Sequence, residues 1–256
     1  MTDLPQPLVL RHPDQPTLAA AAGARLVLAL HRAQAGGATT QHVALTGGSM
    51  GSAILGSAGA SGLVAVVDWS RVHFWWGDER YLPTGHPDRN ETQNRAALLD
   101  RLVSEHGLPA ANLHAVAGPD LSTDAAASAA AYARQLRAHG SGEWDLVLLG
   151  MGPDGHVASL FPHHPAQRVA DAIAVTVSDS PKPPPIRVSL TFACLTRARR
   201  VWFLVAGADK AAAVCRALTP GADPWDVPAA GVRGRGETLW LVDEPAASLS
   251  RGWATG

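Results

Sequence analysis

One short stretch, residues 145–162, sets the strongest constraint on what this chain can fold into. Residues 146–149 (Leu-Val-Leu-Leu) form a continuous apolar run, which is typical of a strand buried on both faces of a parallel sheet. Gly150, Gly152, Pro153 and Gly155 then interrupt the run. The stretch therefore predicts a parallel strand that ends in a glycine-rich turn. The following residues, 157–161, are compatible with the start of a helix.

Short apolar segments alternate with helical patterns along the rest of the chain. Strands are expected at residues 8–10, 42–45, 72–76, 112–116, 144–149, 172–177, 186–190, 201–205 and 238–242. Helices are expected from residue 18 to Gly36, from residue 50, and at residues 98–103, 124–139 and 209–218. No low-complexity linker and no repeat interrupts the alternation. The sequence predicts a single α/β domain over residues 1–256, with a mostly parallel sheet flanked by helices.

Composition excludes several classes of function. A formal net charge of -1 gives no bias towards nucleic acid or an anionic membrane, so an anionic ligand requires a local cluster of cations. No apolar run approaches the length of about 20 residues needed to cross a bilayer, and no signal peptide is visible. Cys194 and Cys215 lie in segments expected to be buried, without metal-type spacing. These features predict a cytoplasmic protein that binds neither nucleic acid nor membrane.

Unusual polar residues collect where predicted strands end. Four such segments stand out, at residues 46–49, 78–80, 154–156 and 209–210. In a parallel sheet the carboxyl ends of the strands meet at one edge, and ligands bind there. Asp154 and His156 lie in the turn after the central strand and are the candidates for chemistry. The competing interpretation is an ordinary turn with a surface histidine.

The residues after the second predicted strand suit a phosphate group. Gly47, Gly48 and Ser49 precede a helix and offer backbone N–H groups and a hydroxyl. Lys210 and Arg187 are candidates for the cations that a phosphate dianion needs. Each of these features alone is often structural, either as a tight turn or as a solvated charge.

The same turn also matches a nucleophile elbow, because residues 47–51 read Gly-Gly-Ser-Met-Gly. Against this alternative, the motif falls early in the chain, and the last histidine, His164, leaves no late member for a triad. A metal site is also disfavoured, because the spacing of His156, His163 and His164 matches no ligand pattern and no cysteine or glutamate completes it. The sequence predicts neither a metal nor another cofactor.

Three motifs together resemble the 6-phosphogluconolactonase family of the glucosamine-6-phosphate isomerase/deaminase superfamily. They are residues 150–162 (Gly-Met-Gly-Pro-Asp-Gly-His-Val-Ala-Ser-Leu-Phe-Pro), 76–80 (Trp-Gly-Asp-Glu-Arg) and 46–49 (Thr-Gly-Gly-Ser). Residues 187–191 and 207–210 also follow the order and spacing of the family. The resemblance implies a Rossmann-like α/β fold and hydrolysis of the sugar-phosphate lactone 6-phospho-D-glucono-1,5-lactone to 6-phosphogluconate, in the oxidative pentose phosphate pathway.

The related deaminases share the Asp-Gly-His turn, so other positions must separate the two activities. Deaminases resemble Asp-Gly-His-Ile-Ala-Phe-Asn-Glu-Pro, whereas Phe161 stands at the position of that glutamate here. Arg80, in place of the deaminases' tyrosine after Asp-Glu, also favours the lactonase. One departure is Arg89, between Asp88 and Asn90, where many lactonases resemble Asp-Ser-Asn; Asn90 is retained, and the role of the loop stays open.

A lactone needs a base and a stabiliser for the developing oxyanion, but no covalent nucleophile. We expect His156 to be the base, in its neutral form and at a helix N-terminus, with Asp154 either orienting it or contacting sugar hydroxyls. Arg80 is expected to stabilise the oxyanion, together with N–H groups of Gly152 or Gly155.

The remaining site residues are assigned to binding. Ser49, Arg187 and Lys210, with the amides of Gly47 and Gly48, are expected to hold the phosphate. Asp78 and Glu79 are assigned either to the site or to a structural role, fixing Arg80 or capping the next helix. Besides the deaminase, the sequence leaves open a sugar-phosphate sensor without catalysis.

Overall fold

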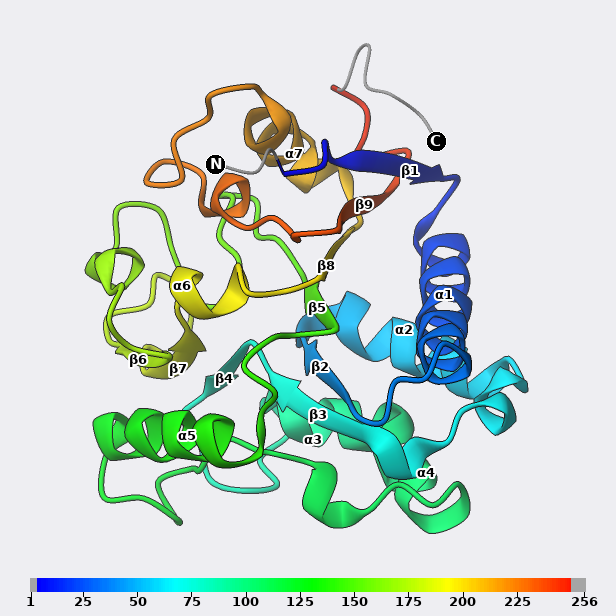
Figure 1. Ribbon diagram of the computed structural model, residues 1–256. Helices are drawn as coiled ribbons and strands as arrows, with labels where there is room; N and C mark the ends of the chain where they lie inside the picture. The colour runs from blue at the N-terminus through cyan, green and yellow to red at the C-terminus, as the bar shows by residue number, and fades with distance from the viewer. Residues whose placement is uncertain (1–3, 250–256) are drawn as a thin grey trace.

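The computed structural model describes residues 4–249 and contains a six-stranded parallel sheet in the order β1-β9-β8-β5-β2-β3 (Figure 1). Its strands are β1 (Leu8–His12), β9 (Glu237–Asp243), β8 (Arg200–Val205), β5 (Leu146–Leu149), β2 (Gln41–Leu45) and β3 (Val72–Trp76). A second, antiparallel sheet has the order β4-β7-β6, with β4 (Asp78–Arg80), β7 (Arg187–Leu190) and β6 (Ala174–Val177).

Helices cover both faces of the large sheet. They are α1 (Gln15–Ala35), α2 (Gly48–Ala60), α3 (Asn90–Asn94), α4 (Asp100–Glu105), α5 (Ala125–His139), α6 (Phe192–Leu195) and α7 (Ala211–Leu218). Alternate residues of β5 serve two cores: Leu146 and Leu148 pack with α1, α2 and α4, whereas Val147 and Leu149 pack with α5, α6 and α7. This two-sided burial explains the continuous apolar run that was predicted as a parallel strand. No helix within residues 4–249 is long and apolar enough to span a membrane.

Local chemistry fixes the first helix pair. Asp14 caps α1 by accepting a hydrogen bond from the Thr17 backbone N–H at 2.8 Å. At Gly23 the backbones of α1 and α2 approach so closely that a Cβ would lie 2.7 Å from Ala58 N and Ile54 O. A glycine is therefore required where α1 crosses α2.

The small sheet joins the large one directly after β3. The backbone N–H of Gly77 donates to Leu45 O in the large sheet, and its carbonyl accepts from Leu190 N in β7. The Tyr132 hydroxyl of α5 binds both the N–H and the carbonyl of Trp76. Figure 1 shows the small sheet beside the large one, close to α5 and α6. Chain segments on both sides of Gly77 are thus held in fixed positions.

Four expectations from the sequence were wrong in detail. Residues 112–116 form no strand but only an isolated bridge between Leu113 and Phe74, preceded by a 3₁₀ turn. Residues 78–80, expected as a turn, are strand β4. The predicted strands at 172–177 and 186–190 belong to the separate antiparallel sheet. Cys194 is buried as expected, but Cys215 is partly exposed.

The fifth correction concerns residues 157–161, which do not begin a helix. Val157 and Leu160 form an isolated bridge, and Ala158 between them has a φ of 49°. Ser159 is tied on both sides, because its N–H donates to Ser189 Oγ and its hydroxyl donates to Asp78 Oδ2 at 2.6 Å. These tertiary hydrogen bonds hold the segment in an extended turn.

Candidate active site

A pocket of about 260 Å³ opens at the carboxyl ends of β2 and β5. Fifteen residues line it: Thr46, Gly47, Gly48, Asp78, Arg80, Asn90, Gly150, Met151, Gly152, His156, Ala158, Lys182, Pro183, Arg187 and Lys210. All four segments that the sequence placed at one edge of the sheet contribute residues to this lining, so the predicted convergence is confirmed. Ser49, Asp154 and Gly155 do not line the pocket. Ser49 and Gly155 are chain neighbours of the lining residues Gly48 and His156, and Asp154 contacts His156.

His156, which lines this pocket, forms a close pair with Asp154. His156 Nδ1 lies 2.5 Å from Asp154 Oδ1. Although burial opposes the effect, the hydrogen bond and the charge of His156 lower the pKa of Asp154 to about 2. Asp154 is therefore a carboxylate at neutral pH and accepts the Nδ1 proton of the ring. The second ring nitrogen, Nε2, keeps its lone pair for another partner.

The turn that carries this pair depends on two glycines. A Cβ at Gly152 would lie 2.1 Å from the His156 ring and 2.3 Å from Asp154 Oδ1. Gly155 has a φ of 92°, in the left-handed region that other residues avoid. The turn is closed by hydrogen bonds from Gly152 N to His156 O and from Gly155 N to Gly152 O.

The structure of this turn corrects two expectations about the surroundings of His156. The N–H groups of Gly152 and Gly155 already have acceptors inside the turn, so they are not free to bind an oxyanion. No helix follows His156, so no helix N-terminus acts on its ring. Instead, the ring packs against Phe161 with 4.6 Å between ring centroids. An aromatic wall thus occupies the position where the related deaminases carry a glutamate.

Arg80 reaches the pocket from β4, and Glu79 holds its backbone. The Glu79 carboxylate accepts hydrogen bonds, each 2.8 Å long, from the N–H groups of Arg80, Asn90 and Glu91. It thereby fixes Arg80 and caps α3, which confirms the structural role left open for it. Burial raises the pKa of Glu79 to about 7, although Arg89 and the three N–H groups act against that effect.

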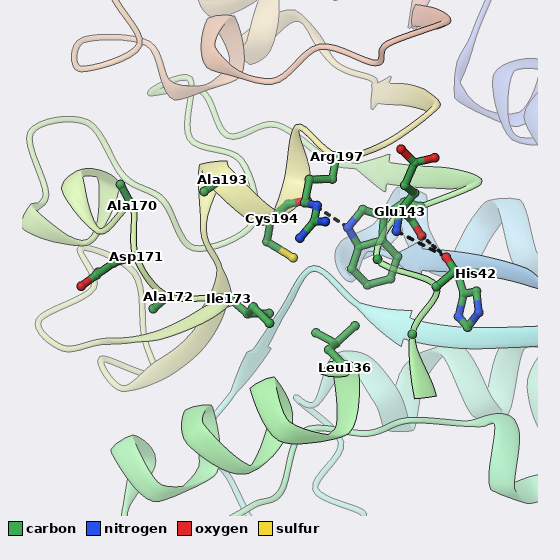
Figure 2. Close-up of a pocket in the computed structure, with 14 residues that line it drawn as sticks. His42, Leu136, Glu143, Ala170, Asp171, Ala172, Ile173, Ala193, Cys194 and Arg197 are labelled. Carbon is green, nitrogen blue, oxygen red and sulfur yellow. Dashed lines mark hydrogen bonds between the residues drawn. The ribbon is translucent and has the colours of Figure 1, made fainter. Parts of the chain in front are cut away.

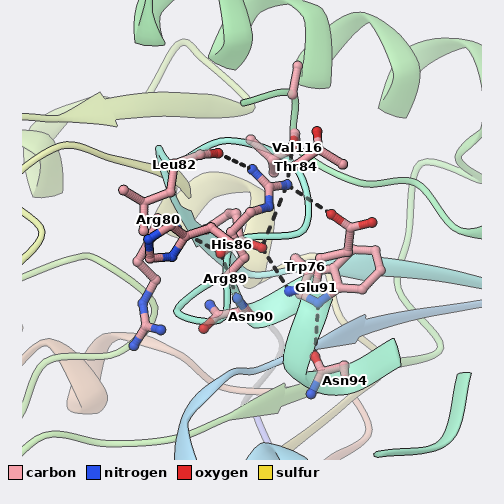
Figure 3. Close-up of polar contacts among 12 residues, drawn as sticks. Trp76, Arg80, Leu82, Thr84, His86, Arg89, Asn90, Glu91, Asn94 and Val116 are labelled. Atoms are coloured by element: carbon pink, nitrogen blue, oxygen red, sulfur yellow. Dashed lines mark hydrogen bonds and ion pairs between the residues drawn. The ribbon is translucent and has the colours of Figure 1, made fainter. Parts of the chain in front are cut away.

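Arg89 is the buried centre of the loop before α3 (Figure 3). Its side chain is 1% exposed and donates to Glu91 Oε2 at 3.0 Å, to Val116 O at 2.6 Å and to Leu82 O at 2.9 Å. The same guanidinium lies 3.9 Å from Glu79 Oε2. Arg89 therefore does not contact the pocket but ties its loop to β4 and to residue 116.

Asp78 and Asn90 connect the two halves of the pocket wall. Asp78 accepts from the Ser159 hydroxyl and lies 3.9 Å from Arg187 Nη1. Asn90 Nδ2 donates to Asp78 O at 2.8 Å, while Asn90 Oδ1 is buried without a hydrogen-bond partner among residues 4–249. A Cβ at Gly47 would lie 1.7 Å from that oxygen, which explains why a glycine stands there.

The pocket also contains cations and a helix N-terminus. Gly47 precedes α2 without a side-chain cap, so the first N–H groups of this helix have no capping partner. Lys210 Nζ lies 2.6 Å from Asp209 Oδ2 at the start of α7. Arg187 is 5% exposed on β7. Backbone donors and two cations thus meet where the sequence predicted a phosphate.

Sequence reasoning missed Lys182 as a pocket residue. It belongs to the proline-rich loop before β7, to which the sequence analysis assigned no role. The available signal was compositional: the chain has 21 lysines and arginines, of which only Lys182 and Lys210 are lysines, and both line this pocket.

A second cavity of about 230 Å³ lies at the other end of the strands (Figure 2). His42, near the start of β2, and Trp144, directly before β5, line it with Cys194 and Arg197. Ligands of open α/β sheets bind at the carboxyl ends of strands, and this cavity adjoins the amino ends. The pocket with His156 is therefore the candidate active site.

The nucleophile-elbow alternative finds no support in the geometry. Ser49 is the second residue of α2, but no hydrogen bond joins it to a histidine within residues 4–249. The acid in contact with His156 is its chain neighbour Asp154. In the described part of the chain, no three His, Cys, Asp or Glu side chains are placed so that they could hold a metal ion together.

Comparison with known proteins agrees with this geometry. A family model described as glucosamine-6-phosphate isomerases/6-phosphogluconolactonase matches residues 13–240. The 6-phosphogluconolactonase of Streptomyces coelicolor is 47% identical over 257 residues, covering 97% of this chain and 95% of that protein. The Mycobacterium tuberculosis 6-phosphogluconolactonase is 44% identical over 243 residues, covering 92% of this chain and 95% of that protein.

A solved structure extends the similarity to three dimensions. The 6-phosphogluconolactonase of Trypanosoma brucei superposes with a TM-score of 0.79 at 28% sequence identity. The match covers 96% of this chain and 99% of that chain. The similarity therefore includes both the large sheet and the segments that form the pocket.

Proposed function

The chain belongs to the family of glucosamine-6-phosphate isomerases and 6-phosphogluconolactonases, and from this premise we infer that it hydrolyses 6-phospho-D-glucono-1,5-lactone to 6-phosphogluconate. The observation that carries the inference is the His156–Asp154 pair in one pocket with Arg80, Arg187 and Lys210. A base and several cations in one pocket suit a lactone that carries a phosphate.

During the hydrolysis one proton is transferred twice, first from water to His156 and then from His156 to the ring oxygen. His156 Nε2 takes a proton from water as the water oxygen bonds to lactone C1, while Asp154 holds the Nδ1 proton. Arg80 lines the pocket, and its positive charge stabilises the negative oxygen that develops on C1. The ring C1–O bond then breaks, and the proton returns from His156 to the ring oxygen. Atoms and charge balance without a cofactor.

The phosphate binds to the backbone donors and cations of the pocket. Gly47, Gly48 and Ser49 supply the first turn of α2, and Arg187 and Lys210 supply positive charge. Asn90 lines the same pocket, where its Nδ2 bond to Asp78 O fixes the side chain. Gly152 keeps space beside the histidine, and Gly155 and Asp78 position the turn and the wall behind it.

Two alternative activities fit this site less well. A deaminase would use a carboxylate near the histidine, but Phe161 packs against the ring. A sensor would have no use for a histidine oriented by a carboxylate. We further propose that the chain works as a single domain in the cytoplasm on its small substrate, without nucleic acid or membrane, in line with its net charge of -1.

The test generates the lactone with glucose-6-phosphate dehydrogenase and follows its hydrolysis through 6-phosphogluconate dehydrogenase. Ammonia release from glucosamine 6-phosphate is measured in parallel. We expect lactone hydrolysis well above the spontaneous rate and no ammonia. Ammonia release without lactone hydrolysis would make the chain a deaminase, and tight sugar-phosphate binding without either reaction would make it a sensor.

A further inference from the structure

The two lysines of this chain lie in the same pocket. Of 21 basic residues other than histidine, 19 are arginines, and Lys182 and Lys210 are the exceptions. Both line the candidate active site. An ammonium is a compact charge with three donors that turn freely, which suits the rounded surface of a phosphate dianion. The position of Lys182 therefore calls for an explanation beyond chance.

The pocket cations differ in how far their charge is already balanced. Lys210 is paired with Asp209 at 2.6 Å, and Arg187 lies 3.9 Å from Asp78. Lys182 forms no ion pair with any carboxylate in the described part of the chain. Asp154, the carboxylate that acts on it most, is already hydrogen-bonded to His156. Lys182 thus adds an uncompensated positive charge to the wall.

Arg187 fixes the loop that carries Lys182. Its Nη2 donates to Lys182 O at 3.0 Å and to Pro183 O at 3.2 Å, and its Nε donates to Pro184 O at 3.2 Å. Only Nη1 is left to face Asp78 and the pocket. Most hydrogen-bond donors of Arg187 therefore hold the loop that carries Lys182, although the charge of Arg187 still acts on the pocket.

Three positive charges held in one wall repel one another. Burial is the largest cause that lowers the pKa of Lys182; the charges of Lys210 and Arg187 lower it further, whereas those of Asp154 and Asp209 raise it. Such a cluster is unfavourable in the empty protein and becomes favourable when an anion enters. A phosphate dianion would relieve the repulsion and gain charge-assisted hydrogen bonds.

We propose that Lys182 binds the phosphate of the substrate together with Lys210, and that Arg187 is the positioning residue that places Lys182. The proposal rests on the proposed function and deepens it by naming what selects a phosphorylated lactone over an unphosphorylated one. It assigns a binding role to the proline-rich loop, residues 181–185, that its composition did not reveal.

The test compares two lactones on three variants. Hydrolysis of 6-phosphogluconolactone and of glucono-1,5-lactone is measured for Lys182→Met, Lys182→Arg and the unchanged protein. We expect Lys182→Met to raise KM for the phosphorylated lactone about 10- to 100-fold with little change in kcat. Its kcat/KM for glucono-1,5-lactone should stay unchanged. Lys182→Arg keeps the charge and should recover part of the affinity.

Arg134→Met is the matched control, because it removes one positive charge from the exposed side of α5, away from the pocket. It should leave both lactones unaffected. An equal loss on both lactones in Lys182→Met would place Lys182 at the reacting carbonyl or in the fold and overturn the proposal. A KM unchanged from that of the parent protein would overturn it as well.

A binding measurement separates this proposal from the proposed function, because it needs no catalysis. By calorimetry, Lys182→Met should weaken binding of 6-phosphogluconate by about the same 10- to 100-fold, whereas Arg134→Met should not. In the unchanged protein, amines are labelled with pyridoxal 5′-phosphate and borohydride, and the peptides are identified by mass spectrometry. We expect 6-phosphogluconate to protect Lys182 from labelling; labelling at Lys182 that 6-phosphogluconate does not reduce would contradict the proposal.

Discussion

At the scale of single residues, the site depends on contacts that leave one group of each side chain available. His156 lines the pocket and pairs with Asp154 through Nδ1, which leaves Nε2 outside that pair. Asn90 binds Asp78 through its nitrogen and keeps Oδ1 without a partner among the described residues. Because the occupied atom fixes the free one, these residues are oriented before a substrate binds.

Asp154→Asn tests the orientation of the histidine. The amide of the variant has no negative charge to stabilise the protonated imidazole ring. The amide also offers an N–H donor as well as an acceptor, which permits the wrong tautomer of the ring. We expect kcat for 6-phosphogluconolactone to fall about 10²-fold with little change in KM. Asp226→Asn is the control, because it alters a second Asp–His pair. Asp226 Oδ1 lies 3.5 Å from His163 Nε2, and both side chains are exposed. A normal kcat in Asp154→Asn would exclude the orienting role.

At the scale of elements, a buried ionic cluster joins β4 to α3. Arg89 lies between Glu79 and Glu91, and Glu79 in turn holds the backbone of Arg80. Removing Arg89 would leave Glu79 without a cation and Glu91 with only the part-exposed Arg95, 3.6 Å away. The cluster therefore links the stability of this region to the position of a residue in the pocket.

We expect Arg89→Met to lower the free energy of unfolding by about 3 kcal/mol and to lower kcat/KM as well, because Arg80 loses its support. Urea unfolding and the coupled assay measure the two effects. Arg71→Met is the control: Arg71 pairs with Asp68 at 2.9 Å but is 46% exposed, so its loss should cost less than about 1 kcal/mol. Equal costs for the two variants would refute the special role of Arg89.

The element scale also shows where sequence reasoning reached its limit. The large sheet was predictable because strands such as residues 146–149 are apolar throughout and are followed by glycine-rich turns. Strands β4 and β7 have three and four residues, too few for a periodic pattern, and their pairing depends on contacts about 100 residues apart. The helix expected at residue 157 fails for the same reason, because Ser159 is held by Ser189 and Asp78.

The site residues likewise fall into those that the sequence could predict and those that it could not. His156, Asp154 and the glycines were recognisable because they lie in turns directly after apolar strands. Arg89 and Lys182 were not, because nothing in the neighbouring residues indicates that one is buried and the other lines a pocket. Burial and charge pairing of single basic residues are set by the tertiary structure.

At the scale of the whole molecule, the two ends of the large sheet carry different groups of histidines. The catalytic end holds His156, while His42, His73, His114 and His139 stack around Trp75 towards the other end. His73 Nδ1 lies 2.9 Å from His114 Nε2. Burial, together with the charge of neighbouring histidines, lowers the pKa of His42 and of His114 to about 4.

These lowered pKa values predict acid sensitivity. Between the ordinary histidine pKa of 6.5 and about 4, the unfolded chain binds protons at His42 and His114 that the folded protein does not bind. Stability is therefore full above pH 6.5 and falls as the pH drops towards 4. In urea unfolding from pH 7.5 to 5, His114→Gln should reduce the pH dependence by about one proton. An identical pH dependence in the variant would contradict this origin.

The central claim is that His156 is the base of a lactone hydrolysis carried out by the whole pocket. The most direct test measures kcat and KM of His156→Asn for 6-phosphogluconolactone and the affinity of the variant for 6-phosphogluconate. The account predicts that kcat falls about 10²- to 10⁴-fold while 6-phosphogluconate binds nearly as before. A variant that folds and hydrolyses the lactone at the normal rate would contradict the claim.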